Sequence, residues 1–382
     1  MSDSIYLSGA AETVYTRHPA GTVTTPSLLA QAARDAVADA GLEWRDVDGL
    51  GVSSFTLGPD HAVDFAWRAG LGPLGWLMED TNGGASGVNM LQHATHAIAS
   101  GQARTIVLVS GDRMDGGAFQ DLVAEYNSAT AEHLAPLPMS GPNALFAMLT
   151  QRQMAAFGLE REDYGRLVLS QREWAGLNPG AVYRGPLTME QYLEAPIVAP
   201  PLGRFDCVPP VSGADAIVVT AAPSASGAGV VRVRGTETTI NIDDQDGDGL
   251  VTGLAQAAPR AWDTTGIDPA DIDAVGVYDD YPAMIVAQLV DAGLIDPGNI
   301  ARDIASEIAT HRLPVNTSGG QLSAGQAGAA AGMHGIVEVY RQLSGTAGDR
   351  QIEGARLGFV SGYGMVLYRY GACANLALLE RM

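Results

Sequence analysis

The stretch DVDGLGV at residues 46–52 recurs as DIDAVGV at residues 271–277, and this repeat decides the fold. Both aspartates, the second glycine and the closing valine coincide, and the other positions stay apolar or small. Each copy follows a stretch with the spacing of an amphipathic helix, at residues 27–40 in the first half and 249–262 in the second. The repeat therefore predicts a helix, an acidic turn and a short apolar strand in each half.

Both halves continue in the same order beyond this strand. In the first half the glycine-rich turn NGGASG at 82–87 opens a helix of apolar and small residues, and a buried strand follows at 105–110. In the second half the turn NTSGG at 316–320 precedes a similar helix at 325–343 and buried strand sequence at 355–370. Alternating helices and strands predict α/β layers around mostly parallel sheets.

A long insertion, at about 112–210, interrupts the first half. It contains two stretches with helical character, at 144–157 and 161–175, followed by an extended proline-rich segment. Such an excursion is longer than ordinary connections, which is typical of a lid or loop domain over a pocket. We therefore predict two halves, 1–226 and 227–382, with the insertion as a loop domain of the first.

Composition excludes several classes of protein. The 382 residues include 22 basic and 43 acidic side chains, for a formal net charge of −21, which disfavours binding to nucleic acids and to anionic membranes. With 46% hydrophobic residues the chain is not disordered, and no apolar run reaches the roughly 18 residues of a membrane span. The N-terminus lacks the pattern of a signal peptide, and Cys207 and Cys373 are too few for a disulfide framework, so we expect a cytoplasmic protein.

The two glycine-rich turns are the first candidates for a site. Each opens a helix, and helix N-termini carry N–H groups without helical partners and the positive end of a dipole. Two such ends facing each other would hold an anionic intermediate. Helices rich in glycine and alanine also pack closely in protein cores, so the spacing alone leaves both interpretations open.

Motifs along nearly the whole chain carry a resemblance to a known family. The chain resembles the thiolase superfamily, specifically the sterol-carrier or lipid-transfer type of thiolase. The matching segments, in chain order, are GASG (84–87), GDRM (111–114), NP (178–179), VSGADA (211–216), YDDY (278–281), NTSGG with GQAG (316–320 and 325–328) and SGYG (361–364). The resemblance implies a thiolase fold, in which duplicated α/β halves form five layers, α/β/α/β/α, with an inserted loop domain.

The chain departs from this family at the residues that carry its covalent chemistry. Gly84 stands where thiolases have the nucleophilic cysteine, and Gln326 stands where they have the activating histidine. The family's second cysteine falls at Val360 or Ser361, and neither cysteine of this chain lies on a matching motif. An acyl-enzyme needs a nucleophile and its base, so thiolysis and Claisen condensation are disfavoured.

A retro-aldol cleavage needs no acyl-enzyme. The resemblance extends to cysteine-less members, steroid side-chain aldolases that act on β-hydroxyacyl-CoA thioesters. It implies a carbon–carbon lyase that is active with a partner subunit. It also implies a homodimer and a heteromeric complex with a small protein bearing an OB fold and a zinc ribbon, the DUF35 type. No metal or organic cofactor is expected in this chain, and the substrate itself carries coenzyme A.

Tyrosines and aspartates are the candidate acid and base groups. Tyr281 falls on the motif beside the site, and Tyr363 stands between two glycines in the C-terminal glycine-rich motif. A phenol serves as acid or base where its surroundings lower its pKa. Asp279 and Asp280 are expected to orient these phenols or to act as base, and as a solvated pair at a strand end they would have no role. Tyr278 lies on the opposite strand face from Asp279 and is expected in the core.

Four further positions are expected to contact the substrate. The Asn316 amide and the backbone around Gly364 would donate to the oxyanion of a thioester enolate. Gln326 and Gly84 occupy the positions of the lost histidine and cysteine. Two other functions stay open: a non-catalytic subunit that binds lipid or acyl-CoA or serves as a scaffold, and an acyltransferase with an unrecognised nucleophile such as Cys207.

Overall fold

Nine strands form one mixed sheet, in which two parts of similar topology meet edge to edge. The computed structural model describes residues 4–59, 61–124, 132, 141–223, 229–242, 247–367 and 370–382, side chains at 124, 365–367 and 370 excepted. The strand order is β3-β2-β4-β7-β1 in the first part and continues as β8-β11-β10-β9 in the second. These strands are β1 (Tyr6–Glu12), β2 (Gly49–Ser53), β3 (Trp76–Glu79), β4 (Thr105–Asp112), β7 (Gly213–Thr220), β8 (Val231–Ile240), β9 (Ala274–Val277), β10 (Leu357–Leu367) and β11 (Tyr370–Arg381).

The repeated aspartate has the same structural task in both parts. The Asp48 carboxylate accepts hydrogen bonds from the backbone N–H groups of Arg104 and Thr105, where β4 begins. The Asp273 carboxylate accepts the N–H groups of Arg356 and Leu357, where β10 begins. Each aspartate thus ties the strand after it to the next strand of the sheet, which explains why the repeat has an acidic residue at this position.

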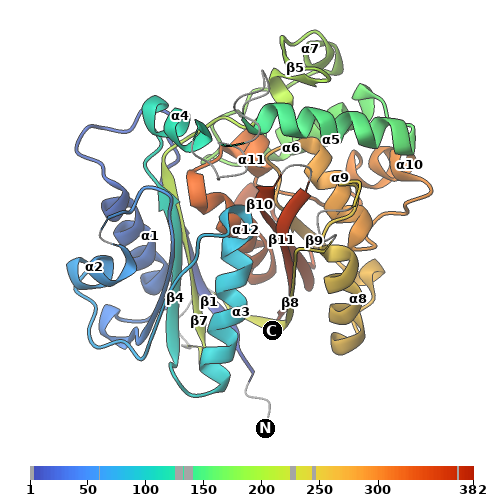
Figure 1. Cartoon of the computed structure of the whole chain (residues 1–382). Coiled ribbons are helices and arrows are strands. Elements are labelled where there is room, and N and C mark those ends of the chain that lie inside the picture. The colour runs from blue at the N-terminus through green and yellow to red at the C-terminus, as the bar shows by residue number, and fades with distance from the viewer. Residues whose placement is uncertain are drawn as a thin grey trace.

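The two parts of the sheet are joined where β1 pairs with β8, and helices pack between their inner faces and cover their outer faces (Figure 1). α1 packs on β1, β4 and β7, α8 packs on β8 and β11, and α3 contacts α12 between the two parts. The result is the five-layer α/β/α/β/α arrangement. The helices are α1 (Thr25–Asp39), α2 (His61–Arg68), α3 (Ser86–Ala99), α4 (Gly116–Ala124), α5 (Pro142–Phe157), α6 (Arg161–Leu177), α7 (Met189–Leu193), α8 (Leu254–Thr265), α9 (Pro282–Asp291), α10 (Ile300–Asp303), α11 (Gly320–Ala324) and α12 (Ala331–Ser344).

Alternating side chains of the strands fill separate cores on the two sides of the sheet. Along β4, Ile106 and Leu108 join the central core, whereas Val107 and Val109 join the core beneath α1. Successive strand residues point to opposite faces, so a strand that is apolar throughout buries both faces. This accounts for the continuous apolar run that the sequence shows here.

Two details differ from the sequence-based expectations. The sheet is not mostly parallel: β2 runs parallel to β3 and β4, and β9 to β10, but the other neighbouring strands are antiparallel. Helical connections link the parallel strands. By contrast, β7, which follows the long insertion, runs antiparallel to β4, and β11, which follows β10, runs antiparallel to β10. The second buried helix begins at Ala331 rather than at 325, because Gly325 and Gly328 have φ of +121° and +61°.

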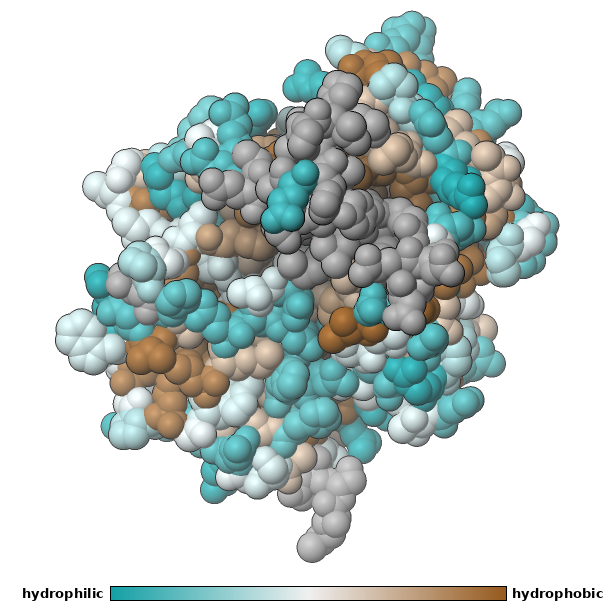
Figure 2. Space-filling view, viewed as in Figure 1, coloured by the Kyte–Doolittle hydropathy of each residue, from teal (hydrophilic) through white to brown (hydrophobic). Residues whose placement is uncertain are grey.

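The insertion forms a helical cap on the sheet layers. It contains α4 to α7 and a small hairpin of β5 (Ile197–Ala199) and β6 (Leu202–Gly203), at the top of Figure 1. The expected boundary between 226 and 227 lies outside the described residues. Within the described part of the chain, no helix has the length and apolarity to cross a membrane. Hydrophilic residues cover much of the described surface in Figure 2, as the acidic composition predicts.

Candidate active site

A cavity of about 730 Å³, counting its open mouth, lies where the cap meets both halves of the fold. Four polar side chains line it. Tyr278 and Asp280 follow the end of β9, Tyr363 lies on β10, and Gln326 lies in the loop between α11 and α12. The turn before α3 contributes backbone at Gly83 and Gly84. The remaining wall is largely apolar and comes mainly from α4, α5 and α9, with Phe55, Phe119, Leu122, Val123, Leu145, Phe146 and Met284.

Gly84 has no room for a side chain. A Cβ atom at this position would collide with the ring of Tyr278 and with the backbone carbonyl of Tyr363. The phenol of Tyr278 thus fills the space that a cysteine at position 84 would need. The lack of a side chain at position 84 and the position of the Tyr278 ring therefore depend on each other.

Tyr278 and Asp280 form a hydrogen-bonded pair in the cavity wall. The Tyr278 hydroxyl donates to Asp280 Oδ2 at 2.8 Å. Burial raises the pKa of Asp280 to about 7, the nearby charge of Asp279 raises it too, and the bond from Tyr278 opposes the rise. With its amide nitrogen turned toward this carboxylate, Gln321 donates to Asp280 Oδ1 at 2.8 Å. A carboxylate with a pKa near neutrality can accept a proton at physiological pH.

Asp279 points to the other side of the strand end. Its carboxylate accepts the Gln321 N–H at 3.0 Å, the Leu322 N–H at 3.4 Å and the Gln171 amide at 2.7 Å. Burial raises its pKa to about 6 despite these hydrogen bonds. Asp279 does not line the cavity, and its bonds to the start of α11 instead hold the chain that carries Tyr278 in place.

Tyr363 lines the same cavity as Gln326. Its hydroxyl oxygen accepts the Gly371 N–H at 2.7 Å. Gly364 is not among the residues that line the cavity, and a Cβ there would collide with the carbonyl of Asn82. Gly364 thus brings β10 against the glycine-rich turn, and Tyr363 is the neighbouring residue that lines the cavity.

Tyr281 lies one layer behind the cavity wall. Its ring stacks on Phe146, with 4.4 Å between the ring centroids, and its hydroxyl donates to Asn143 Oδ1 at 2.6 Å. These contacts fasten the start of α9 to α5 of the cap. The structure therefore places Tyr278, rather than Tyr281, beside Asp280 in the cavity.

Asn316 and Gln326 both hold backbone in place. The Asn316 amide donates to the carbonyl of Val277 at 3.0 Å and accepts its N–H at 2.8 Å, which pins the end of β9 just before Tyr278. Asn316 lines a small internal cavity behind Tyr278 and not the main one. Gln326 does line the main cavity, and its amide contacts the backbone of Gly328 at 3.2 and 3.4 Å.

Neither cysteine has the surroundings of a nucleophile. Cys207 packs against the apolar cluster that surrounds the cavity, and burial, with the charges of Asp206 and Asp280, raises its pKa to about 12. Burial raises the pKa of Cys373 to about 12 as well. Reactive cysteines have lowered pKa values, so an acyl-enzyme at either thiol is disfavoured.

Fold and site together define a class: a thiolase-like scaffold whose cavity, in the described part of the chain, has a tyrosine–aspartate pair beside Gly84. The family model for thiolase C-terminal domain-like proteins matches residues 235–373. A 17-hydroxy-3-oxo-4-pregnene-20-carboxyl-CoA lyase of Mycobacterium tuberculosis is 33% identical over 84% of this chain and 86% of its own. A steroid side-chain-cleaving aldolase of Thermomonospora curvata is 30% identical over 84% and 85%.

A solved structure agrees with these relatives. A chain of the Ltp2–ChsH2(DUF35) aldolase superposes with a TM-score of 0.85 at 25% identity, over 99% of this chain and 98% of its own. The chain therefore belongs to the thiolase superfamily, in its lipid-transfer type. The expected family and fold are confirmed, and so is the expected class of enzyme, a lyase of the aldolase kind.

Proposed function

We propose that this protein cleaves the Cα–Cβ bond of a β-hydroxyacyl-CoA thioester by a retro-aldol reaction. The observation that carries the proposal is the Tyr278–Asp280 pair, which faces an apolar cavity where Gly84 leaves no nucleophile. This arrangement supplies proton transfer without acyl transfer.

The Tyr278–Asp280 pair acts as the base. The β-hydroxyl passes its proton to the Tyr278 oxygen while the Tyr278 hydroxyl passes its own proton to Asp280, along the 2.8 Å hydrogen bond. The electron pair of the former O–H bond forms the new carbonyl, and the Cα–Cβ bond breaks. Its electrons move onto Cα and the thioester oxygen, which gives an enolate and a released ketone or aldehyde.

Two features beside the Tyr278–Asp280 pair serve the enolate. The turn at Gly83 and Gly84 faces the cavity and leads into α3, so the positive end of the helix dipole lies where the enolate charge develops. Tyr363 lines the same cavity and protonates Cα, which completes the shortened acyl-CoA. Asn316 and Gly364 act indirectly in this mechanism, because they position Tyr278 and β10.

The apolar walls indicate the kind of group that leaves. Aromatic and aliphatic side chains from α4, α5 and α9 make up most of the cavity, which fits a bulky hydrophobic ketone such as a steroid ring system. The names of the relatives support this substrate class. We also propose a partner of the DUF35 type, which the name of the Ltp2–ChsH2(DUF35) aldolase supports. We further propose that this partner has an OB fold and a zinc ribbon and that the chain forms a homodimer.

A direct assay tests the reaction. The full chain, with and without a DUF35-type partner, is incubated with a 17-hydroxysteroid 20-carboxyl-CoA and the products are analysed by mass spectrometry. We expect equal amounts of a steroid 17-ketone and an acyl-CoA shortened at the former Cα–Cβ bond. No cleavage with the partner present, despite demonstrated binding of the thioester, would instead support a non-catalytic binding subunit.

The proposed base predicts a pH dependence. The base acts in its ionised form, and burial raises the pKa of Asp280 to about 7, so kcat/KM should rise roughly tenfold per pH unit below pH 7 and level off above it. Asp280→Asn should remove this limb and lower the rate at every pH. A flat profile of kcat/KM between pH 5.5 and 8 in the unaltered enzyme would show that Asp280 is not the base.

A further inference from the structure

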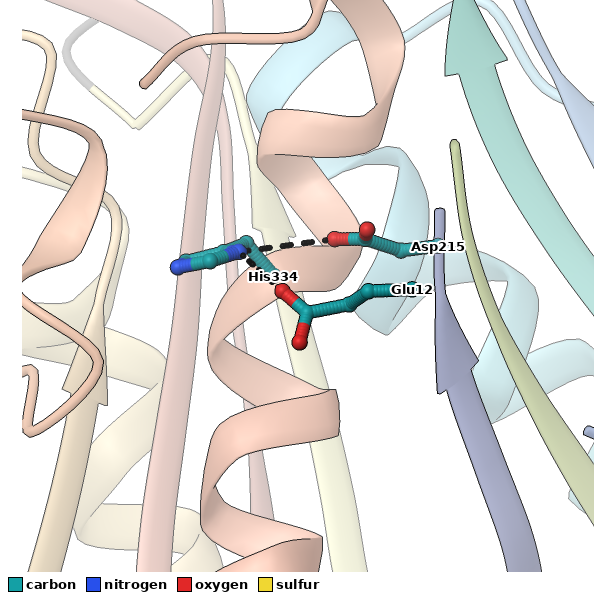
Figure 3. Close-up of side chains that lie close together, drawn as sticks. All are labelled: Glu12, Asp215 and His334. Carbon is teal, nitrogen blue, oxygen red and sulfur yellow. Dashed lines mark ion pairs between the residues drawn. The ribbon is translucent and has the colours of Figure 1, made fainter. Parts of the chain in front are cut away.

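A second groove, of about 1130 Å³ with its open mouth, shares no lining residue with the active-site cavity. Its wall includes Glu12 at the end of β1, Tyr15, and His334 and Arg341 on α12. Figure 3 shows one nitrogen of the His334 ring facing Glu12 and Asp215, and the other pointing away from them. The groove therefore gives solvent an approach to a buried histidine between the two halves of the fold.

The His334 imidazole stands between two carboxylates. His334 Nδ1 is 3.2 Å from Glu12 Oε1 and 3.5 Å from Asp215 Oδ2. The Tyr15 hydroxyl donates to Asp215 at 2.8 Å and lies 3.3 Å from the same Nδ1. Burial alone would lower the pKa of His334, but the hydrogen bond and charge of Asp215, with the charges of Glu338 and Asp279, raise it above its usual value.

The charges of this cluster fit a proton better than a metal ion. Ligand-type atoms of Glu12, Asp215 and His334 lie within 4.8 Å of one another, as in a metal site. Arg341 already pairs with the second oxygen of Glu12. Arg341 and an imidazolium together balance the two carboxylates, whereas a divalent cation in place of the proton would leave excess positive charge in a buried site.

The other ring nitrogen of His334 faces an internal cavity. His334 Nε2 lies 2.8 Å from Ser318 Oγ, and both residues line the small cavity behind the active site. Asp279 and Tyr278 line the same internal cavity, and Tyr278 also lines the active-site cavity. His334 thus separates the groove from the internal cavity, and Tyr278 separates the internal cavity from the substrate.

We propose that His334 exchanges protons between the catalytic Tyr278–Asp280 pair and the solvent in the second groove. This inference rests on the proposed retro-aldol reaction. A neutral histidine that carries its proton on Nδ1 can take up a proton at Nε2 on one side of a barrier, pass through the imidazolium, and release the Nδ1 proton on the other side. Rotation of the neutral ring then restores the starting form for the next turnover. Ser318, Asp279 and Tyr278 provide the polar groups between that nitrogen and the pair.

Asp280 lines the open active-site cavity, so the route serves it while substrate or products still fill that cavity. The proton leaves the β-hydroxyl for Asp280, whereas Cα receives its proton from Tyr363. After each turnover Asp280 therefore holds one proton too many and Tyr363 holds one too few. The excess proton passes from Asp280 through Tyr278 and the internal cavity to His334 and then to the groove. Tyr363 regains its proton from solvent when the products leave the active-site cavity, so the balance closes.

Kinetics of His334→Gln test the proposal, with His96→Gln as control. His96 is an exposed histidine on α3, outside both cavities and the groove. For His334→Gln we expect kcat at least about tenfold lower, less than the 10²–10⁴-fold of a direct acid or base. The rate of a single turnover with enzyme in excess should not change, and added imidazole should restore part of kcat. His96→Gln should match the unaltered enzyme.

Several outcomes would overturn the proposal. If folded His334→Gln enzyme keeps an unaltered kcat, turnover does not depend on proton exchange through His334. An equal loss in single-turnover and steady-state rates, without rescue by imidazole, makes His334 a merely structural residue. If His334→Gln does not fold, Ser318→Ala carries the same test, because it removes the partner of Nε2 and keeps the ion pairs of Nδ1. Cleavage by the unaltered enzyme is measured separately, so failure of the proposed function remains distinguishable.

Discussion

Replacement of Tyr278 by phenylalanine is expected to lower kcat by about 10²–10⁴-fold, the usual contribution of a positioned acid or base. The phenylalanine ring still fills the space above Gly84, so the cavity keeps its shape. Only the hydroxyl that bonds Asp280 at 2.8 Å is lost, and with it the path of the β-hydroxyl proton. KM should change little, because the substrate's CoA and ring contacts remain. Steady-state kinetics with a β-hydroxyacyl-CoA measure both constants.

Tyr281→Phe is the matched control for this variant. It also removes a buried hydroxyl that has a hydrogen-bond partner, the one that donates to Asn143 at 2.6 Å. Its loss should lower the free energy of unfolding by about 1 kcal/mol, with kcat nearly unchanged. A large loss of kcat in Tyr281→Phe together with an active Tyr278→Phe would return the acid–base role to Tyr281 and contradict the present mechanism.

The sequence predicted the layers of the fold because the same local physics recurs in both halves. Asp48 and Asp273 stand at the same place in the repeat and bond the starts of β4 and β10 in the same way. Strand direction could not be predicted in this way, since it depends on how long connections return to the sheet. The start of α12 was also missed, because the φ values of Gly325 and Gly328 are not visible in a run of small residues.

The site was partly visible in the sequence. The resemblance to the thiolase motifs pointed to Gly84, Gln326 and Tyr363, and all three line the cavity. The prediction that Tyr278 lies in the core is confirmed, because its side chain is buried. Its place in the cavity wall beside Asp280 was not predicted, although strand alternation places residues 278 and 280 on one face. The missing signal was the pairing of a large ring with a residue that has no side chain, which only the packing of Tyr278 on Gly84 reveals.

That packing makes Gly84→Ala the second decisive variant. A single methyl group would collide with the Tyr278 ring and with the Tyr363 carbonyl. Overpacking of this kind costs about 1–3 kcal/mol of stability. A shift of the phenol by about 1 Å should cost roughly 10²-fold in kcat, because proton transfer depends on placement. Chemical denaturation and steady-state kinetics measure the two effects.

Two companion variants give the result its meaning. Gly72→Ala places a methyl group in open space and should change stability by less than about 0.5 kcal/mol. In the double variant Gly84→Ala with Tyr278→Ala, the ring no longer opposes the methyl group, so the stability costs should be less than additive, although the Tyr363 carbonyl still opposes it. Strict additivity would mean that the Tyr278 ring is not what excludes a side chain at position 84, and full activity in Gly84→Ala would mean that position 84 can hold a side chain beside Tyr278. The loss of the nucleophile and the placement of the phenol would then be independent features.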